Sequence, residues 1–240
     1  TKFSNYHFAT HKTYKKRLIQ LGENPKNIHL VGSPGVENFK KYKLIDKEKL
    51  FKELSLNIND KKILITFHPE TNSTLDYERQ IDIILKSIKN FKKEQLIFTF
   101  SNSDPYGHLF VKKILKNIKT KKNIKIFNSL GSLKYLSLLN NVDLIMGNSS
   151  SGIIEAPATH VPTLNIGTRQ NGRVMYSSIT NCELDSDKIK STINKILYRR
   201  KKIKKNIIRN FNTSKLICSK IKKILNKNNL EKKMFHDIKS

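Results

Sequence analysis

The chain has 240 residues, enough for one substantial domain or for one domain with appendages. It carries 47 Lys and Arg against 19 Asp and Glu, a formal net charge of +28. No apolar run approaches the roughly 20 residues that cross a bilayer, and the first residues lack the apolar core of a signal peptide. We therefore expect a cytoplasmic protein without a membrane partner, in which Cys182 and Cys218 are reduced and bind no metal.

The positive charge raises nucleic acid as a partner. However, the lysines are spread along the whole chain between Asn and Ile, and no zinc-finger, RNP or helix-turn-helix pattern accompanies them. In the most basic part, residues 188–233, apolar positions recur at helical spacing, which indicates helices with solvated basic faces. We expect no nucleic-acid partner. A non-catalytic nucleic-acid-binding protein stays an alternative, which tight, salt-sensitive binding to DNA or RNA would support.

The chain alternates between helix-like and strand-like segments. Helices are expected at 10–21, 47–54, about 81–88, 109–118 and 133–139, and strands at 28–31, 63–67, 96–100, 124–127, 142–146 and 162–166, with a turn at 32–35. Near-continuous apolar strands separated by helices are typical of a parallel sheet that is covered on both faces. The sequence therefore predicts an α/β, Rossmann-like fold.

Polar residues follow four of the expected strands directly. They are His68, Asn102, residues 128–129 and residues 148–150. In a parallel sheet, ligands bind outside the carboxyl ends of the strands. The four polar strand ends therefore predict one shared site along that edge of the sheet.

The segment 147–173, GNSSSGIIEAPATHVPTLNIGTRQNGR, contains the most specific pattern. An apolar strand leads through Ser149 and Ser150 into a short helix, and a helix start offers unpaired N–H groups and partial positive charge to a phosphate. Arg169 and Arg173 could bring fixed positive charge to the same anion. Helix capping is the alternative role for the serines, and a solvated surface position is the alternative for Arg169.

This segment resembles the UDP-N-acetylglucosamine 2-epimerases, in particular the hydrolysing branch of sialic and legionaminic acid synthesis. The matching stretches are 20–25 (QLGENP), 31–35 (VGSPG), 67–71 (FHPET), 100–104 (FSNSD), 147–157 (GNSSSGIIEAP) and 165–173 (NIGTRQNGR). The pair GNSSSG and GTRQNGR is specific, whereas HPET alone is weak.

The resemblance implies the C-terminal half of a two-domain fold like that of the GT-B glycosyltransferases. Residues 1–31 would be the end of an N-terminal domain and the crossover, 32–209 the nucleotide-binding domain, and 210–240 a C-terminal helix and basic tail. The chain starts with Thr1 in what resembles the middle of an element, so we expect a fragment of a longer protein. The absent half would carry the acid/base carboxylates, and the full-length enzyme would be a homo-oligomer.

The resemblance also implies a role for each candidate residue. His68 would be catalytic, beside the diphosphate or the reacting sugar. Residues expected to bind the UDP part are Asn102, Phe127, Asn148, Ser149, Ser150, Glu155, Arg169 and Arg173. Among these, Glu155 would bind the ribose hydroxyls, and Phe127 and its neighbours would lie near the uracil. For Glu155 the alternative is a first-turn acid favoured by the helix dipole, and for Phe127 it is the core.

By resemblance, the full enzyme removes the C2 proton of a UDP-sugar as UDP leaves C1, and hydrates the resulting 2-acetamidoglucal with inversion at C2. The product would be N-acetylmannosamine or a diacetamido analogue. No cofactor or metal is expected, and this chain alone would bind UDP without turning it over. A GT-B-type UDP-sugar glycosyltransferase is the other alternative, which a product assay distinguishes.

Overall fold

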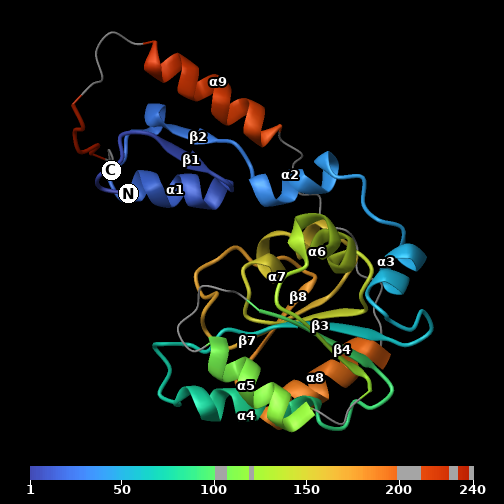
Figure 1. Cartoon of the computed structure of the whole chain (residues 1–240). Coiled ribbons are helices and arrows are strands. Elements are labelled where there is room, and N and C mark those ends of the chain that lie inside the picture. Colours follow the sequence, from blue (N-terminus) through green and yellow to red (C-terminus); the bar gives the residue numbers. More distant parts are fainter. Residues whose placement is uncertain (101–106, 119–121, 199–211, 227–231, 238–240) are drawn as a thin grey trace. The chain divides into compact units, whose positions relative to one another are not determined.

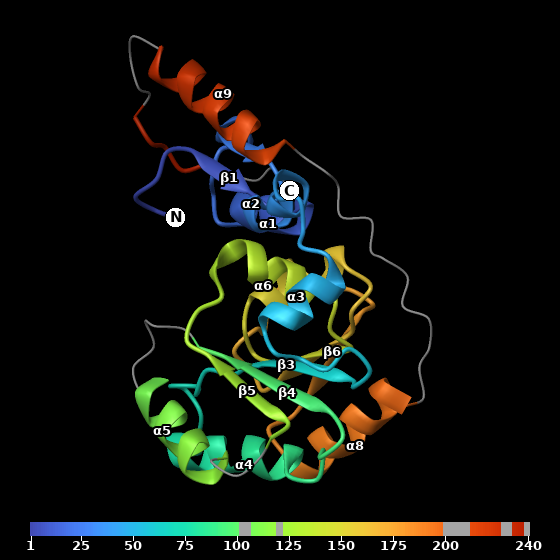
Figure 2. The same ribbon diagram turned by 45° about the vertical axis from the view of Figure 1, so that its right-hand side comes forward.

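The computed structural model describes residues 1–100, 107–118, 122–198, 212–226 and 232–237 (Figures 1 and 2). Contacts divide the chain into two compact units, one of Thr1–Tyr42 with Ile208–Ser240 and one of Lys43–Ile207. Residues 32–42 thus group with the first unit by contacts. The domain boundaries expected from the sequence stay a prediction.

The larger unit contains one parallel sheet. Its strands are β3 (Lys62–Thr66), β4 (Gln95–Thr99), β5 (Ile124–Phe127), β6 (Leu144–Gly147), β7 (Thr163–Ile166) and β8 (Ile179–Cys182), in the order β5-β4-β3-β6-β7-β8. Figures 1 and 2 show α4 (Tyr77–Ile88), α5 (Gly107–Ile118) and α8 (Ser186–Tyr198) on one face. The other face carries α3 (Lys47–Glu53), α6 (Gly131–Leu139) and α7 (Ser151–Ile154), followed by the short η2 (Ala156–Ala158). The predicted Rossmann-like α/β fold is confirmed.

The main core lies between the sheet and helices α4 and α8. Alternate strand residues point into it, among them Ile63, Ile65, Phe98, Leu164 and Ile166, and they meet Ile81, Ile84, Ile189 and Ile193 of the two helices. All of these side chains are buried. Each contributes roughly 1.5–3 kcal/mol on leaving water, so the sheet is a rigid support for the loops at its carboxyl edge.

The order of the strands creates a switch point between β3 and β6. The chain builds β3, β4 and β5 in one direction, then returns to place β6 on the free side of β3. The loops after β3 and β6 therefore leave the sheet toward opposite faces, and a crevice opens between them. Thr66 and Gly147 are partners in the register at this point.

The smaller unit has two parallel strands, β1 (His7–Ala9) and β2 (Ile28–Leu30). Its helices are α1 (Lys12–Gln20), the short η1 (Pro25–Asn27), α2 (Pro34–Lys41) and α9 (Thr213–Leu225). The buried carboxylate of Glu23 binds His7 Nε2 at 2.8 Å and Lys233 Nζ at 2.8 Å. His236 N–H donates to the carbonyl of Gly22 at 2.9 Å, so the segment 232–237 is attached beside the end of α1.

Three elements differ from the sequence expectation. The turn predicted at 32–35 extends into a helix, because Pro34 takes the first helical position, where its missing N–H costs nothing. Strands β1 and β8 were not predicted. β8 has the sequence ITNC and a half-exposed pattern, since it forms the edge of the sheet. In the described part of the chain, no helix is long and apolar enough to cross a membrane.

Candidate nucleotide-binding site

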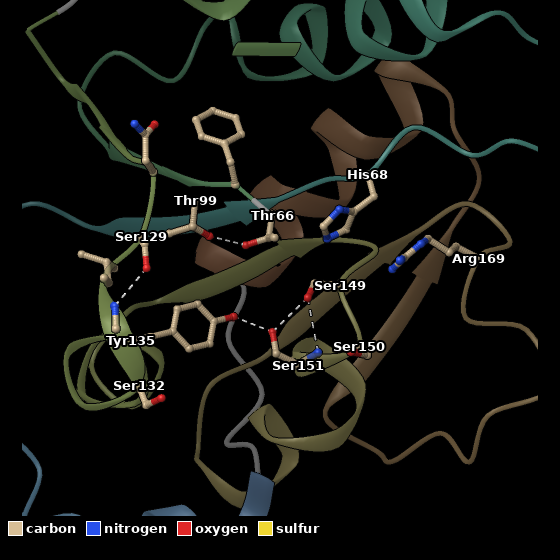
Figure 3. A pocket seen from close by; sticks show the side chains of 14 residues that line it. Thr66, His68, Thr99, Ser129, Ser132, Tyr135, Ser149, Ser150, Ser151 and Arg169 are labelled. Carbon is tan, nitrogen blue, oxygen red and sulfur yellow. Dashed lines mark hydrogen bonds between the residues drawn. The ribbon is translucent and has the colours of Figure 1, made fainter. Parts of the chain in front are cut away.

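A cavity of about 510 Å³ opens at the switch point (Figure 3). Its walls come from the ends of β3 and β4, the loop 128–132, helix α6, the serines before α7 and the loop after β7. Of the four polar strand ends predicted to meet, it brings together His68, residues 128–129 and residues 149–150. Asn102 lies outside the described residues.

The side chain of Asn148 makes two hydrogen bonds to the backbone of His68. His68 N–H donates to Asn148 Oδ1 at 2.8 Å, and Asn148 Nδ2 donates to the His68 carbonyl at 2.8 Å. Asn148 is completely buried. The side chain of Asn148 is thus directed at the backbone of His68, and the expected contact of Asn148 with the nucleotide stays a prediction. The two loops of the switch point are joined by this pair.

Arg169 and Gln170 extend the link to the loop after β7. Arg169 Nη1 donates to the Asn148 carbonyl at 3.0 Å, and Gln170 Nε2 donates to the same oxygen at 2.7 Å. Figure 3 shows the His68 ring, Ser149 and the Arg169 guanidinium directed toward one another at the cavity. Cationic and hydroxyl groups in this arrangement can bind an anion with two or more phosphate oxygens.

The floor of the cavity is a run of hydroxyl groups. The hydroxyls of Thr66 and Thr99 are 2.6 Å apart, that of Tyr135 lies 2.5 Å from Ser151 Oγ, and Ser151 Oγ lies 3.2 Å from Ser149 Oγ. Burial raises the pKa of Tyr135, so this phenol stays protonated. Sequence reasoning missed Thr66, Thr99 and Tyr135. A threonine as the last residue of two apolar strands was the available signal.

Ser149 makes a cap-like contact before α7, because its Oγ accepts from the N–H of Ser151 at 3.4 Å. Ser150 stands at the N-cap position, but its side chain makes no capping hydrogen bond. Within the described ranges, no acceptor is recorded for the backbone N–H groups of Ser149 and Ser150. The predicted alternative of simple capping therefore leaves the hydroxyl of Ser150 and two N–H groups unexplained, whereas a phosphate would satisfy them.

Glu155 lies one turn further on and does not line this cavity. Burial raises the pKa of its carboxyl to about 7, and the charge of Arg173 opposes that rise. Among the described residues, no hydrogen-bond partner reaches Glu155 Oε2, although the atom is buried. An unsatisfied buried carboxyl oxygen is costly, and it suits a partner with hydroxyl groups. Arg173 is exposed and is placed near Glu155 rather than in the cavity.

Phe127 lines a second cavity, of about 540 Å³, together with Leu54 of the loop after α3. The loop 129–132 belongs to both cavities, so they are neighbours. Phe127 is half-buried and is not part of the main core. The structure thus places Phe127 next to the cavity of His68 and Ser149, but not in it.

The sequence profile of the family described as UDP-N-acetylglucosamine 2-epimerase matches residues 1–222. The chain belongs to this family. It is 39% identical over 187 residues to a GDP/UDP-N,N'-diacetylbacillosamine 2-epimerase (hydrolyzing) from Campylobacter jejuni, which covers 77% of this chain and 48% of that protein. It is 37% identical over 196 residues to the polysialic acid biosynthesis protein P7 of Escherichia coli, covering 81% of the chain and 49% of that protein.

The chain thus spans about half the length of these two relatives. Among solved structures, the UDP-GlcNAc 2-epimerase from Neisseria meningitidis bound to UDP-GlcNAc superposes with a TM-score of 0.73 at 18% identity. That comparison covers 92% of this chain and 62% of the other. It establishes that the fold is shared.

Proposed function

We propose that this chain is the UDP-sugar-binding part of a hydrolysing UDP-N-acetylglucosamine 2-epimerase, or of the corresponding enzyme for a UDP-diacetamido sugar. The observation that carries the proposal is the meeting of His68, Ser149 and Arg169 at one cavity on the switch point of the sheet. Membership of the epimerase family and the hydrolysing activity named for the Campylobacter jejuni relative support the reaction class.

In this proposal the diphosphate occupies the cavity of about 510 Å³. Ser149, Ser150 and the N–H groups at that turn contact one phosphate, and Arg169 contacts the other. His68 lies beside the bond that breaks. Glu155 accepts from the ribose hydroxyls, which would give its buried oxygen a partner. The base extends toward Phe127 and the neighbouring cavity. Asn102 remains a candidate contact to the nucleotide.

The chemistry divides between this chain and the rest of the enzyme. The C1–O bond breaks and UDP leaves, the C2 proton departs to a base, and a C1=C2 double bond forms. Water then adds its hydroxyl to C1 and a proton to C2 from the opposite face. Negative charge grows on the departing diphosphate, and fixed N–H groups with Arg169 stabilise it. The acid/base carboxylates lie in the other half, so this chain contributes stabilisation of the leaving group.

Calorimetry with UDP tests the binding role. We expect the 240-residue chain to bind UDP, and Ser149→Ala to bind about tenfold more weakly because a hydroxyl donor to an anion is lost. Ser219→Ala, an exposed serine of α9 in the other unit, is the matched control and should bind like the parent. Absence of UDP binding by the parent would refute the site assignment.

A product assay tests the reaction. With UDP-N-acetylglucosamine or the diacetamido analogue, the full-length enzyme should release UDP and a free 2-epimerised sugar. Transfer of the sugar to an acceptor would instead indicate a glycosyltransferase. Turnover by the 240-residue chain alone would contradict the division of labour proposed above.

The proposal also covers the setting of the enzyme. Cys182 and Cys218 are free thiols, as is usual for proteins of the reducing cytoplasm. The full-length enzyme is a homo-oligomer, and nucleic acid and membranes are not partners. Sedimentation of the full-length enzyme, with and without DNA at low salt, tests these points, because a monomer or a salt-sensitive DNA complex would contradict them.

A further inference from the structure

The carboxylate of Glu70 binds the loop that carries Arg169. Its Oε1 accepts from the N–H of Thr168 at 2.9 Å and from the N–H of Arg169 at 3.0 Å. Its Oε2 accepts from the Thr168 hydroxyl at 2.7 Å. Three hydrogen bonds to one carboxylate are strong, because the acceptor is charged. Glu70 comes two residues after His68, so these bonds join the loop after β3 to the loop after β7.

Glu70 is itself fixed from behind by helix α4. The side chain of Gln80 is completely buried. Its Oε1 accepts from the N–H of Glu70 at 2.7 Å, and its Nε2 donates to the carbonyls of Glu70 at 3.0 Å and Leu75 at 2.9 Å. The backbone of Glu70 is therefore attached to the core, and its carboxylate presents a rigid acceptor rather than a mobile surface charge.

The turn at Gly167 is shaped around this carboxylate. Gly167 has φ +78°, a conformation that favours glycine. A Cβ at this position would lie 2.3 Å from Glu70 Oε1. The close approach of the loop to the carboxylate thus depends on the absence of a side chain.

The contacts form a closed circuit around the proposed diphosphate site. Glu70 holds the backbone of Arg169, the Arg169 guanidinium binds the Asn148 carbonyl, and Asn148 binds the backbone of His68. Glu70 does not line the cavity of His68 and Arg169. It lines a separate cavity of about 810 Å³, with Thr168 and Lys188.

We propose that Glu70 is a positioning residue that directs Arg169 toward the diphosphate of the nucleotide-sugar. This inference rests on the proposed function and adds to it a residue that touches no ligand. The alternative is a direct effect of its charge. A carboxylate near a diphosphate repels it, so removing that charge alone would tighten UDP binding. A positioning role predicts the opposite change, weaker UDP binding, because Arg169 loses its alignment when the carboxylate is removed.

The test is a double-mutant cycle in UDP affinity, measured by calorimetry on the 240-residue protein. We expect Glu70→Ala to weaken UDP binding about tenfold and Glu70→Gln, which keeps one acceptor oxygen, to weaken it less. In the Arg169→Ala background, Glu70→Ala should cause no further loss, because Glu70 acts through Arg169. Glu78→Gln, an exposed acid of α4, is the matched control and should leave affinity unchanged.

Amide hydrogen exchange tests the contact without ligand. Exchange at Thr168 and Arg169 should be about tenfold faster in Glu70→Ala and unchanged in Glu78→Gln. Thr168→Val removes only the hydrogen bond from the Thr168 hydroxyl to Glu70. This variant replaces the Glu70 variants in the test if those do not fold. It should weaken UDP binding a few fold, again only where Arg169 is present.

Two outcomes would overturn the proposal. One is UDP affinity that stays equal or rises in Glu70→Ala. The other is a loss of equal size with and without Arg169. If the parent binds no UDP at all, the proposed function fails instead, and the exchange rates at Thr168 and Arg169 still decide whether Glu70 holds the loop.

Discussion

At the scale of single residues, hydrogen bonding distinguishes the two acids near the site, Glu70 and Glu155. Glu70 is half-buried and has three hydrogen-bond donors on its carboxylate, whereas Glu155 has a buried oxygen without a described partner. The first carboxylate already has its donors within the protein, whereas the second leaves an acceptor that a ligand can satisfy. The residue type alone could not distinguish these roles.

The raised pKa of Glu155 predicts a dependence of stability on pH. The carboxyl titrates near pH 4.5 in the unfolded chain and near 7 in the folded protein. Between these values the unfolded chain releases its proton first, so stability falls as pH rises through this window, by up to about 3 kcal/mol. Denaturant unfolding should therefore show that the free energy of unfolding of Glu155→Gln rises relative to that of the parent between pH 4.5 and pH 8.

Glu78→Gln, which changes an exposed side chain of α4, is the matched control, and its gain in stability over the parent should be smaller than that of Glu155→Gln. A difference for Glu155→Gln that does not change with pH would contradict the burial of a protonated carboxyl at this position.

At the scale of elements, Gly147 ends β6 against β3. Its φ is +131°, and a Cβ there would lie 2.0 Å from the carbonyl oxygen of Thr66. Because that atom is rigid backbone, Gly147→Ala should destabilise the protein by roughly 3 kcal/mol or more and separate the strand ends at the switch point. Thermal unfolding measures the effect.

Gly172 offers a matched comparison. It also has a positive φ, of +81°, but nothing lies within 4 Å of a Cβ placed on it. Gly172→Ala should therefore cost only the backbone strain, about 1 kcal/mol. Equal losses for the two variants would show that the close approach at Thr66 does not matter.

The long apolar strands and amphipathic helices of the sheet were predictable from sequence, because burial on both faces leaves a continuous apolar run, as in 63–67. The edge strand β8 was not, since one side of ITNC faces solvent and its polar residues hide the pattern. The order of the strands in the sheet could not be predicted from the sequence either. The polar strand ends indicated a shared site, but not that β6 lies beside β3 or that Tyr135 contributes from α6.

At the scale of the whole molecule, the smaller unit depends on a contact between its two distant parts. Lys233 Nζ lies 2.8 Å from the buried carboxylate of Glu23, and it donates to the carbonyl of Ser4 at 2.6 Å. The hydrogen bond from Lys233 is the main reason that the pKa of Glu23 is lowered. The contribution of this ion pair to stability is therefore complete above the ordinary pKa of 4.5, and it is lost as pH falls through the lowered pKa of Glu23.

Lys233→Gln should release the segment 232–237. The N–H of His236, which donates to Gly22, should exchange several-fold faster in this variant at pH 7, and the difference from the parent should shrink as Glu23 is protonated. Lys232→Gln, the exposed neighbour, is the control and should exchange like the parent. Unchanged exchange in Lys233→Gln would exclude this role for the ion pair.

The central claim is that a nucleotide diphosphate occupies the switch-point cavity. An NMR titration of the 240-residue protein with UDP tests it most directly, because each amide reports its own surroundings. The account predicts shifts at Thr66–His68, at 128–132, at 147–151 and at Arg169, with Ile81 and Ile84 of α4 unaffected. Saturable shifts confined to another surface, or none at millimolar UDP, would contradict it.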